Sequence, residues 1–281
     1  MGAQQNRAFI DNPLAFIQEN PVDLMDTLTG LAYTMGTTRR SDTTKPALDA
    51  VANVLGMDDA VMEFDLMPVQ AAGRSWTALR PAIRQYVAPE LRDFFPEAVR
   101  PAVSAYYFPY KTHRIDGSSI QALERTVGWA DVPRMGPTHR FALTGSMNGC
   151  EFAITEAPSA ANFRIWHFQN AASHDHPKLR KAGWPMCGRK VHYWHEFSDY
   201  GTERASGHST KSTEADRMAA WNFLHFTDGK WWLYCQPLEY SVAVSDGAFA
   251  NVPSLYGRAP YRVDLSEHLA TGEYGSIKYA R

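Results

Sequence analysis

The sequence predicts an α+β protein, with a mainly helical N-terminal region over residues 1–100 and a mostly antiparallel, β-sandwich-like domain over residues 101–281. Two observations lead to this prediction. The first hundred residues carry apolar side chains at helical spacing between prolines, whereas the later apolar stretches are short and rich in aromatic and β-branched residues. The chain also contains 8 Trp, 13 Tyr and 14 Phe, most of them after Trp76, and aromatic residues favour strands.

Three helices are expected in the N-terminal region. Asn12 followed by Pro13 is typical of a capping residue with a proline at the first helical position. A second helix is expected to begin at Pro21, and a third to begin at Pro46 and end at Gly56. Helical or irregular segments are expected to continue past the remaining prolines of this region, Pro81, Pro89 and Pro96.

Strands are expected in the second region because the hydrophobic period changes near residue 102. The predicted strands are 103–108, 140–144, 150–155, 163–168, 191–197, 221–226, 230–236 and 261–265. Thr227-Asp228-Gly229 lies between two of them and is a strong hairpin signal. The order of helices followed by strands predicts the α+β class.

One pair of predicted strands brings two reactive side chains together. If Ala157–Ala160 forms a four-residue turn, the register places Cys150 directly opposite His167. Period-2 alternation then puts Phe152 and Ile154 on the same face as these two residues. Directly opposed residues have Cβ atoms roughly 4.5–5.5 Å apart. The sequence therefore predicts a thiol and an imidazole in contact at the end of an apolar row.

This pair suits nucleophilic catalysis. The imidazole of His167 can accept the proton of the Cys150 thiol, and the resulting thiolate is the nucleophile. The glycine-containing loop 145–149 precedes Cys150, and its amides are expected to supply an oxyanion hole. The group that orients the imidazole stays open between a main-chain carbonyl and three side chains, namely Gln169, Asn170 and Asp175.

The segment Met147-Asn148-Gly149-Cys150, followed by a strand-borne His167, resembles the catalytic region of the glutamine deamidase toxins, the group of the cytotoxic necrotizing factor catalytic domain and Burkholderia lethal factor. In that family a Leu-Ser-Gly-Cys motif opens a strand of a β-sandwich and the histidine lies on the next strand. Met147-Asn148 replaces the family's Leu-Ser. The resemblance implies that Cys150 is the nucleophile, that His167 is the base, and that the substrate is a glutamine of a target protein inside a host cell.

Other readings of the same residues stay open. A cysteine protease or a transglutaminase would use the same pair, and an aromatic-rich β domain without activity could bind a partner. His192 and His195 invite a metal site, but a spacing of three on a strand sends them to opposite faces. His174 and His176 are expected in a polar loop. No cofactor and no metal are expected.

Net charge and hydropathy limit which partners and which location are expected for the protein. The formal net charge of −2 argues against nucleic acid as the main partner, because phosphate binding needs a basic excess. No apolar stretch is long enough for a membrane span. No secretory signal is visible, so synthesis in the cytoplasm is expected. The resemblance implies a bacterial toxin or effector that a specialised route delivers to the host cytosol. A host regulatory protein would be its substrate.

Overall fold

The structure is a computed structural model of the whole chain, and it describes ten stretches of it. They are residues 2–24, 44–71, 74–95, 97–111, 115–147, 149–168, 189–195, 218–245, 248–255 and 259–271. The described part is α+β, with more strand than helix.

Nine strands form one large sheet. Its order is β1-β3-β2-β4-β6-β10-β11-β12, and β13 also pairs with β11. The strands are β1 (Val22–Leu24), β2 (Ala60–Ala71), β3 (Arg74–Pro81), β4 (Val103–Tyr107), β6 (Phe141–Leu143), β10 (Met218–Thr227), β11 (Lys230–Ser245), β12 (Ala248–Leu255) and β13 (Tyr261–Asp264). All pairs are antiparallel except β1 with β3 and β4 with β6.

Four strands form a second, antiparallel sheet of order β5-β8-β7-β9. They are β5 (Gly128–Pro133), β7 (Glu151–Glu156), β8 (Asn162–Phe168) and β9 (Val191–His195). A shared apolar core joins the two sheets: Phe152 and Ile165 of the small sheet belong to the same buried cluster as Leu224 and Leu233 of the large one. Phe163 also meets Trp231 edge to face, with ring centroids 5.8 Å apart.

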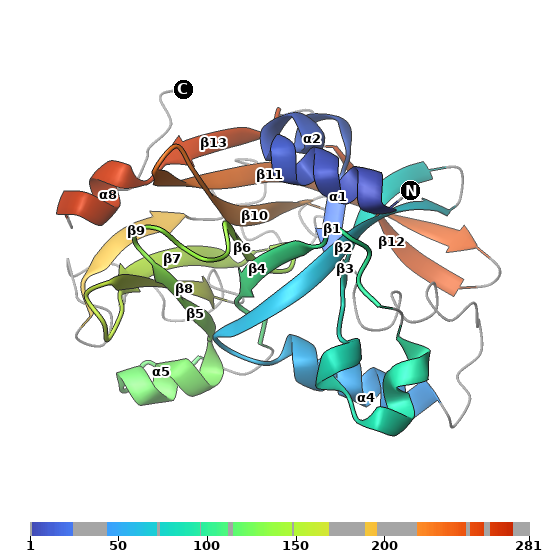
Figure 1. Cartoon of the computed structure of the whole chain (residues 1–281), viewed down its shortest axis with the longest axis horizontal. Helices are drawn as coiled ribbons and strands as arrows, with labels where there is room; N and C mark the ends of the chain where they lie inside the picture. The colour runs from blue at the N-terminus through green and yellow to red at the C-terminus, as the bar shows by residue number, and fades with distance from the viewer. Residues whose placement is uncertain are drawn as a thin grey trace, which may run out of the picture.

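Helices cover the outer faces of both sheets (Figure 1). The helices on these faces are α1 (Gly2–Asp11), α2 (Pro13–Glu19) and α5 (Ile120–Thr126). The other described helical segments are α4 (Thr44–Leu55), α8 (Ser266–Thr271) and the 3-10 turns η1 (Arg84–Tyr86) and η2 (Pro89–Phe94). Phe9 of α1 and Phe16 of α2 enter a core with Trp221 and Phe223 of the large sheet. Leu123 of α5 packs with Trp166 on the outer face of the small sheet.

Buried polar side chains fasten the N-terminal helices to the large sheet. Asn6 donates to Asp65 and to the carbonyl of Pro101, and it accepts from the amide of Leu66. Gln236 of β11 donates to the carbonyl of Ile17 at 2.6 Å. Because each buried polar atom has a partner, these contacts tie segments far apart in sequence at little desolvation cost.

Most predicted elements of the second region are confirmed. The predicted strands correspond to β4, β6–β11 and β13, and their described ends differ from the predicted ones by at most three residues, apart from a longer extension of β11. Residues 196–197 of the predicted strand 191–197 lie outside the described residues. Asp228 and Gly229 both have positive φ and Thr227 pairs with Lys230, as the hairpin prediction requires. In the first region the Asn12 cap is confirmed, since its side chain accepts from the amide of Ala15.

The helical expectation for the first hundred residues is wrong in two places. Residues 22–24 form β1, although Pro21 was expected to open a helix. Residues 60–81 form β2 and β3, which pair with each other, and β2 also pairs with β4. The large sheet therefore contains strands from both sides of the expected boundary near residue 100. The reason lies in Met62, Phe64 and Leu66, which alternate with polar neighbours and face the core at strand spacing.

Within the described stretches, no helix combines the length and the hydropathy needed to cross a membrane.

Candidate functional site

The pairing of β7 with β8 differs from the expected register by two residues. His167 lies directly opposite Phe152, and Ile165 lies opposite Ile154. The prediction that Cys150 and His167 are directly opposed is therefore wrong. The link between the strands is longer than a four-residue turn: it spans residues 157–161 and is closed by a hydrogen bond from the amide of Asn162 to the carbonyl of Ser159. The register places Cys150 diagonally across the strand pair from His167, and such diagonal neighbours are separated by roughly 7–8 Å.

A shift of two residues keeps every side chain on its expected face. Phe152, Ile154 and Ile165 lie in the core between the sheets, and Cys150 belongs to the same buried cluster. Cys150 is 3% exposed and His167 is completely buried. Both residues are therefore on the side of the small sheet that faces the large sheet, at the same end of the strand pair.

Thr144 holds the imidazole of His167. Its hydroxyl shares a hydrogen bond of 2.7 Å with Nδ1 of His167, and both side chains are buried. Nε2 of His167 is buried, and none of the described residues forms a hydrogen bond with it. Thr144 follows β6 directly, and its carbonyl accepts from the indole of Trp221 at 3.0 Å. The large sheet thus supplies the residue that fixes the ring of a histidine in the small sheet.

The loop that leads from Thr144 to Cys150 is anchored at several points. Ser146 donates to Asp23 of β1 at 2.5 Å. Met147 and Ala220 of β10 exchange both backbone hydrogen bonds, at 2.7 and 2.9 Å. Gly149 has φ +68°, a left-handed conformation that glycine adopts without the strain of a side chain. Cys150 therefore follows a fixed bend rather than a free loop.

Tyr110 lies against His167 from the solvent side. The two rings are 5.4 Å apart at an angle of 65°, and Tyr110 is 43% exposed. Burial, and after it the charge of nearby Cys150, raises the pKa of Tyr110. Tyr110 is thus close to both candidate residues.

Gly128 permits this arrangement. In the β5–β8 pair it lies opposite His167, and a Cβ built on it would be 1.7 Å from the carbonyl oxygen of Pro109. The backbone of Pro109 therefore lies directly on Gly128, and the next residue, Tyr110, is carried over the imidazole. A side chain at position 128 would push this segment away.

Burial determines the charge of His167. Loss of hydration lowers its pKa to about 3, so the imidazole is neutral at pH 7. A neutral ring has one nitrogen that accepts a proton. If Nδ1 carries the hydrogen and donates to Thr144, the unpartnered Nε2 is the accepting atom.

The other histidines with described surroundings have separate partners. His192 bonds Arg134 through Nε2 at 3.0 Å, and His225 is 3.3 Å from Arg140. His195 lies next to the hydroxyls of Tyr193 and Tyr261, and across Phe152 from His167. Among the described residues no group of three or more His, Cys, Asp or Glu side chains could hold a metal ion.

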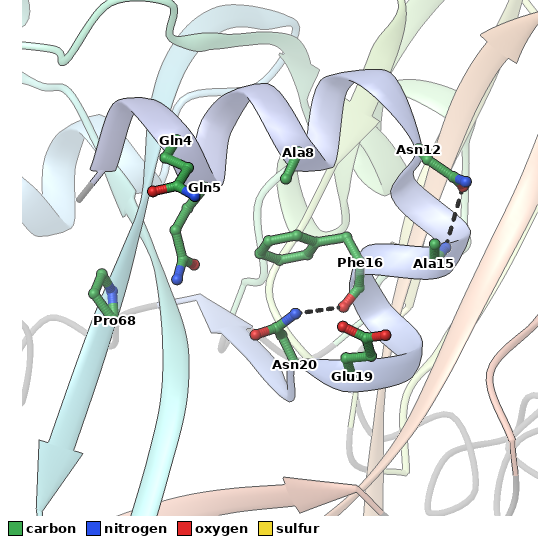
Figure 2. A pocket seen from close by; sticks show the side chains of 9 residues that line it. All are labelled: Gln4, Gln5, Ala8, Asn12, Ala15, Phe16, Glu19, Asn20 and Pro68. Atoms are coloured by element: carbon green, nitrogen blue, oxygen red, sulfur yellow. Dashed lines mark hydrogen bonds between the residues drawn. The ribbon is translucent and has the colours of Figure 1, made fainter.

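A surface pocket of about 420 Å³ lies elsewhere, between α1, α2 and Pro68 of β2 (Figure 2). Four of its nine lining residues carry amide side chains, and two of these amides bond the helix ends. Asn12 accepts from the amide of Ala15, and Asn20 donates to the carbonyl of Phe16. The pocket shares no residue with the Cys150–His167 region.

Several predictions fall outside the described residues. They concern the three side chains proposed to orient the imidazole and the His174–His176 loop. Sequence reasoning missed Thr144, Tyr110 and Gly128. Thr144 stood at the end of a predicted strand, six residues before Cys150, which was the available signal; Tyr110 and Gly128 carry no local signal, because their roles depend on a contact between distant strands.

Comparison with known proteins adds no family: no family model matches the chain, and no curated protein matches it.

Proposed function

We propose that the chain is a cysteine-dependent protein glutamine deamidase, in which Cys150 is the nucleophile and His167 the base. The observation that carries the proposal is the state of His167. One ring nitrogen is held by Thr144 at 2.7 Å, and the other is buried without a hydrogen-bond partner among the described residues. The ring lies on the strand face that also carries Cys150. A base that is oriented by a third group and stands near a thiol is the arrangement that nucleophilic catalysis needs.

The reaction follows from these positions. Nε2 of His167 takes the thiol proton while Sγ of Cys150 attacks the carboxamide carbon of a glutamine, giving a tetrahedral oxyanion. The imidazolium returns the proton to the nitrogen as the C–N bond breaks, and ammonia leaves. Water, deprotonated by His167, then attacks the thioester, which releases glutamate and restores the thiol. The amides of the bend at Gly149 and Cys150 are proposed to bind the oxyanion.

A neutral imidazole in the resting protein is consistent with a base that accepts the thiol proton only when substrate is bound. With a pKa of about 3 the ring does not draw the proton from the thiol in the resting protein. Substrate or water that enters the site restores polarity around the ring and raises its pKa, which makes it a stronger base. The two side chains and the reacting carboxamide together bridge the diagonal distance between Cys150 and His167, because the carboxamide must contact both residues.

The wider proposal follows the resemblance to the glutamine deamidase toxins. The two packed sheets are proposed to act as a β-sandwich-like scaffold, with Cys150 and His167 on adjacent strands. The chain is proposed to be a bacterial effector that reaches the host cytosol and acts on a host regulatory protein. A protease or transglutaminase would use the same two residues and differ in the fate of the acyl group.

A test compares two buried cysteines. The full-length protein, Cys150→Ser and Cys235→Ser are incubated with a eukaryotic cell extract, and peptide mass spectrometry maps glutamines converted to glutamate. Cys235 is the matched control, because it is also a buried cysteine of the same core. We expect the same converted sites for the unaltered protein and Cys235→Ser, and none for Cys150→Ser. Conversion by Cys150→Ser, or cleavage or amine transfer instead of conversion, would contradict the proposal.

A further inference from the structure

Tyr110 lies at the surface against the buried ring of His167. Its ring is 43% exposed, whereas the imidazole that it contacts is completely buried and the thiol of Cys150 is 3% exposed. The ring is therefore part of the wall between the imidazole and solvent.

The backbone on both sides of Tyr110 is fixed. Pro109 lies on Gly128, and Lys111 donates to Asp58 at 2.5 Å and to the carbonyl of Glu124 at 3.0 Å. Tyr110 therefore lies between two residues whose contacts hold them in place.

We propose that Tyr110 is a specificity-determining residue, whose ring closes the Cys150–His167 site and packs against the aliphatic stem of the incoming glutamine. This rests on the proposed function. Because the thiol of Cys150 is only 3% exposed, the reacting carbon must reach inward from the surface. The two methylenes of glutamine provide that reach and give the ring an apolar surface to contact, whereas asparagine has one methylene fewer.

The closing role predicts how fast Cys150 reacts with a small reagent. Iodoacetamide is added to the native full-length protein, to Tyr110→Ala and to Tyr110→Phe, and the alkylated cysteines are quantified by peptide mapping over time. We expect Tyr110→Ala to raise the alkylation rate of Cys150 by about tenfold or more, and Tyr110→Phe to match the unaltered protein, because exposure of the thiol controls its reactivity. Met135→Ala serves as the control, since Met135 is 70% exposed and carries no role here.

Cys235 reports on the fold in the same experiment. It is completely buried, so its alkylation should stay slow in every variant. An unchanged Cys150 rate in Tyr110→Ala would overturn the closing role, and so would an equal rise at Cys235, which indicates general loosening.

The substrate-contacting role predicts that Tyr110→Ala lowers the rate of glutamine conversion, although it raises the rate of Cys150 alkylation. In the cell extract, Tyr110→Ala should convert glutamines about tenfold more slowly than the unaltered protein although its thiol is more accessible, and Tyr110→Phe should keep the same sites and rates. Equal or faster conversion by Tyr110→Ala would overturn this role. Conversion that persists in Cys150→Ser would instead remove the proposed function, while the alkylation result would still decide whether Tyr110 covers the thiol.

Discussion

Replacement of Thr144 by valine tests the link between the two sheets at His167. Valine has nearly the shape of threonine but no hydroxyl, so it leaves Nδ1 of His167 without a partner beside the already unpartnered Nε2. A buried polar atom that loses its partner costs roughly 1–3 kcal/mol. For a chain of this size each kcal/mol lowers the melting temperature by about 2–4 °C, so we expect a fall of roughly 4–8 °C for a mid-range cost.

The catalytic effect should exceed the effect on stability. A base that is no longer oriented loses part of the roughly 10²–10⁴-fold contribution of proton transfer, so glutamine conversion should fall at least tenfold. Thr144→Ser, which keeps the hydroxyl, should restore it. Thr155→Val is the matched control: Thr155 is also buried and accepts from the indole of Trp166 at 2.9 Å, on the opposite face. Thermal unfolding and peptide mapping measure both effects. Unchanged stability and conversion in Thr144→Val, or equal loss of conversion in Thr155→Val, would refute the reasoning.

Two further predictions concern packing and pH. Gly128→Ala should lower the free energy of unfolding by roughly 1–3 kcal/mol in a urea titration, because the new Cβ meets the carbonyl of Pro109. Gly145→Ala is the control and should leave the free energy of unfolding nearly unchanged, because a Cβ there makes ordinary contacts. Similar stabilities of the two variants would contradict the close approach of Pro109 to Gly128. Burial lowers the native pKa of His167 to about 3 and that of His225 to about 4, so between these values and about 6.5 the unfolded chain binds more protons and stability should rise with pH. At pH 4.5 the titration of His167 alone should lower the free energy of unfolding by roughly 2–3 kcal/mol relative to pH 7. In urea titrations the free energy of unfolding of His167→Asn should therefore depend less steeply on pH than that of the unaltered protein. Equal pH dependence of the two proteins would contradict the burial of His167.

Most strands of the β-rich half were predictable from local pattern, whereas β5 and β12 were not predicted. The hairpin at Asp228–Gly229 needs two residues that tolerate positive φ, and the sequence shows them between two aromatic runs. Strands β2 and β3 were missed because prolines were given more weight than the alternation of Met62, Phe64 and Leu66. Pro68 lies within β2 and still pairs with Thr77, so a proline did not end this strand.

The candidate site was predictable by face but not by register. Alternation placed Cys150 and His167 on one side of the small sheet, because a strand period of two survives a shift of two residues. The length of the link after Glu156 could not be read from composition, since its closing hydrogen bond depends on backbone geometry. Thr144 and Tyr110 reach His167 from other strands and loops, and contacts of that kind follow from the packing of the sheets.

The central claim is that the sulfur of Cys150 and Nε2 of His167 serve one reacting carboxamide. It is tested most directly by a crystal structure of the protein alkylated at Cys150 by iodoacetamide, which attaches a carboxamide to the sulfur. We predict that a polar atom of the attached carboxamide lies within about 3.2 Å of Nε2 of His167, while Thr144 keeps its bond to Nδ1. An adduct that leaves Nε2 without a partner, with the ring of Phe152 between the two groups, would contradict the account.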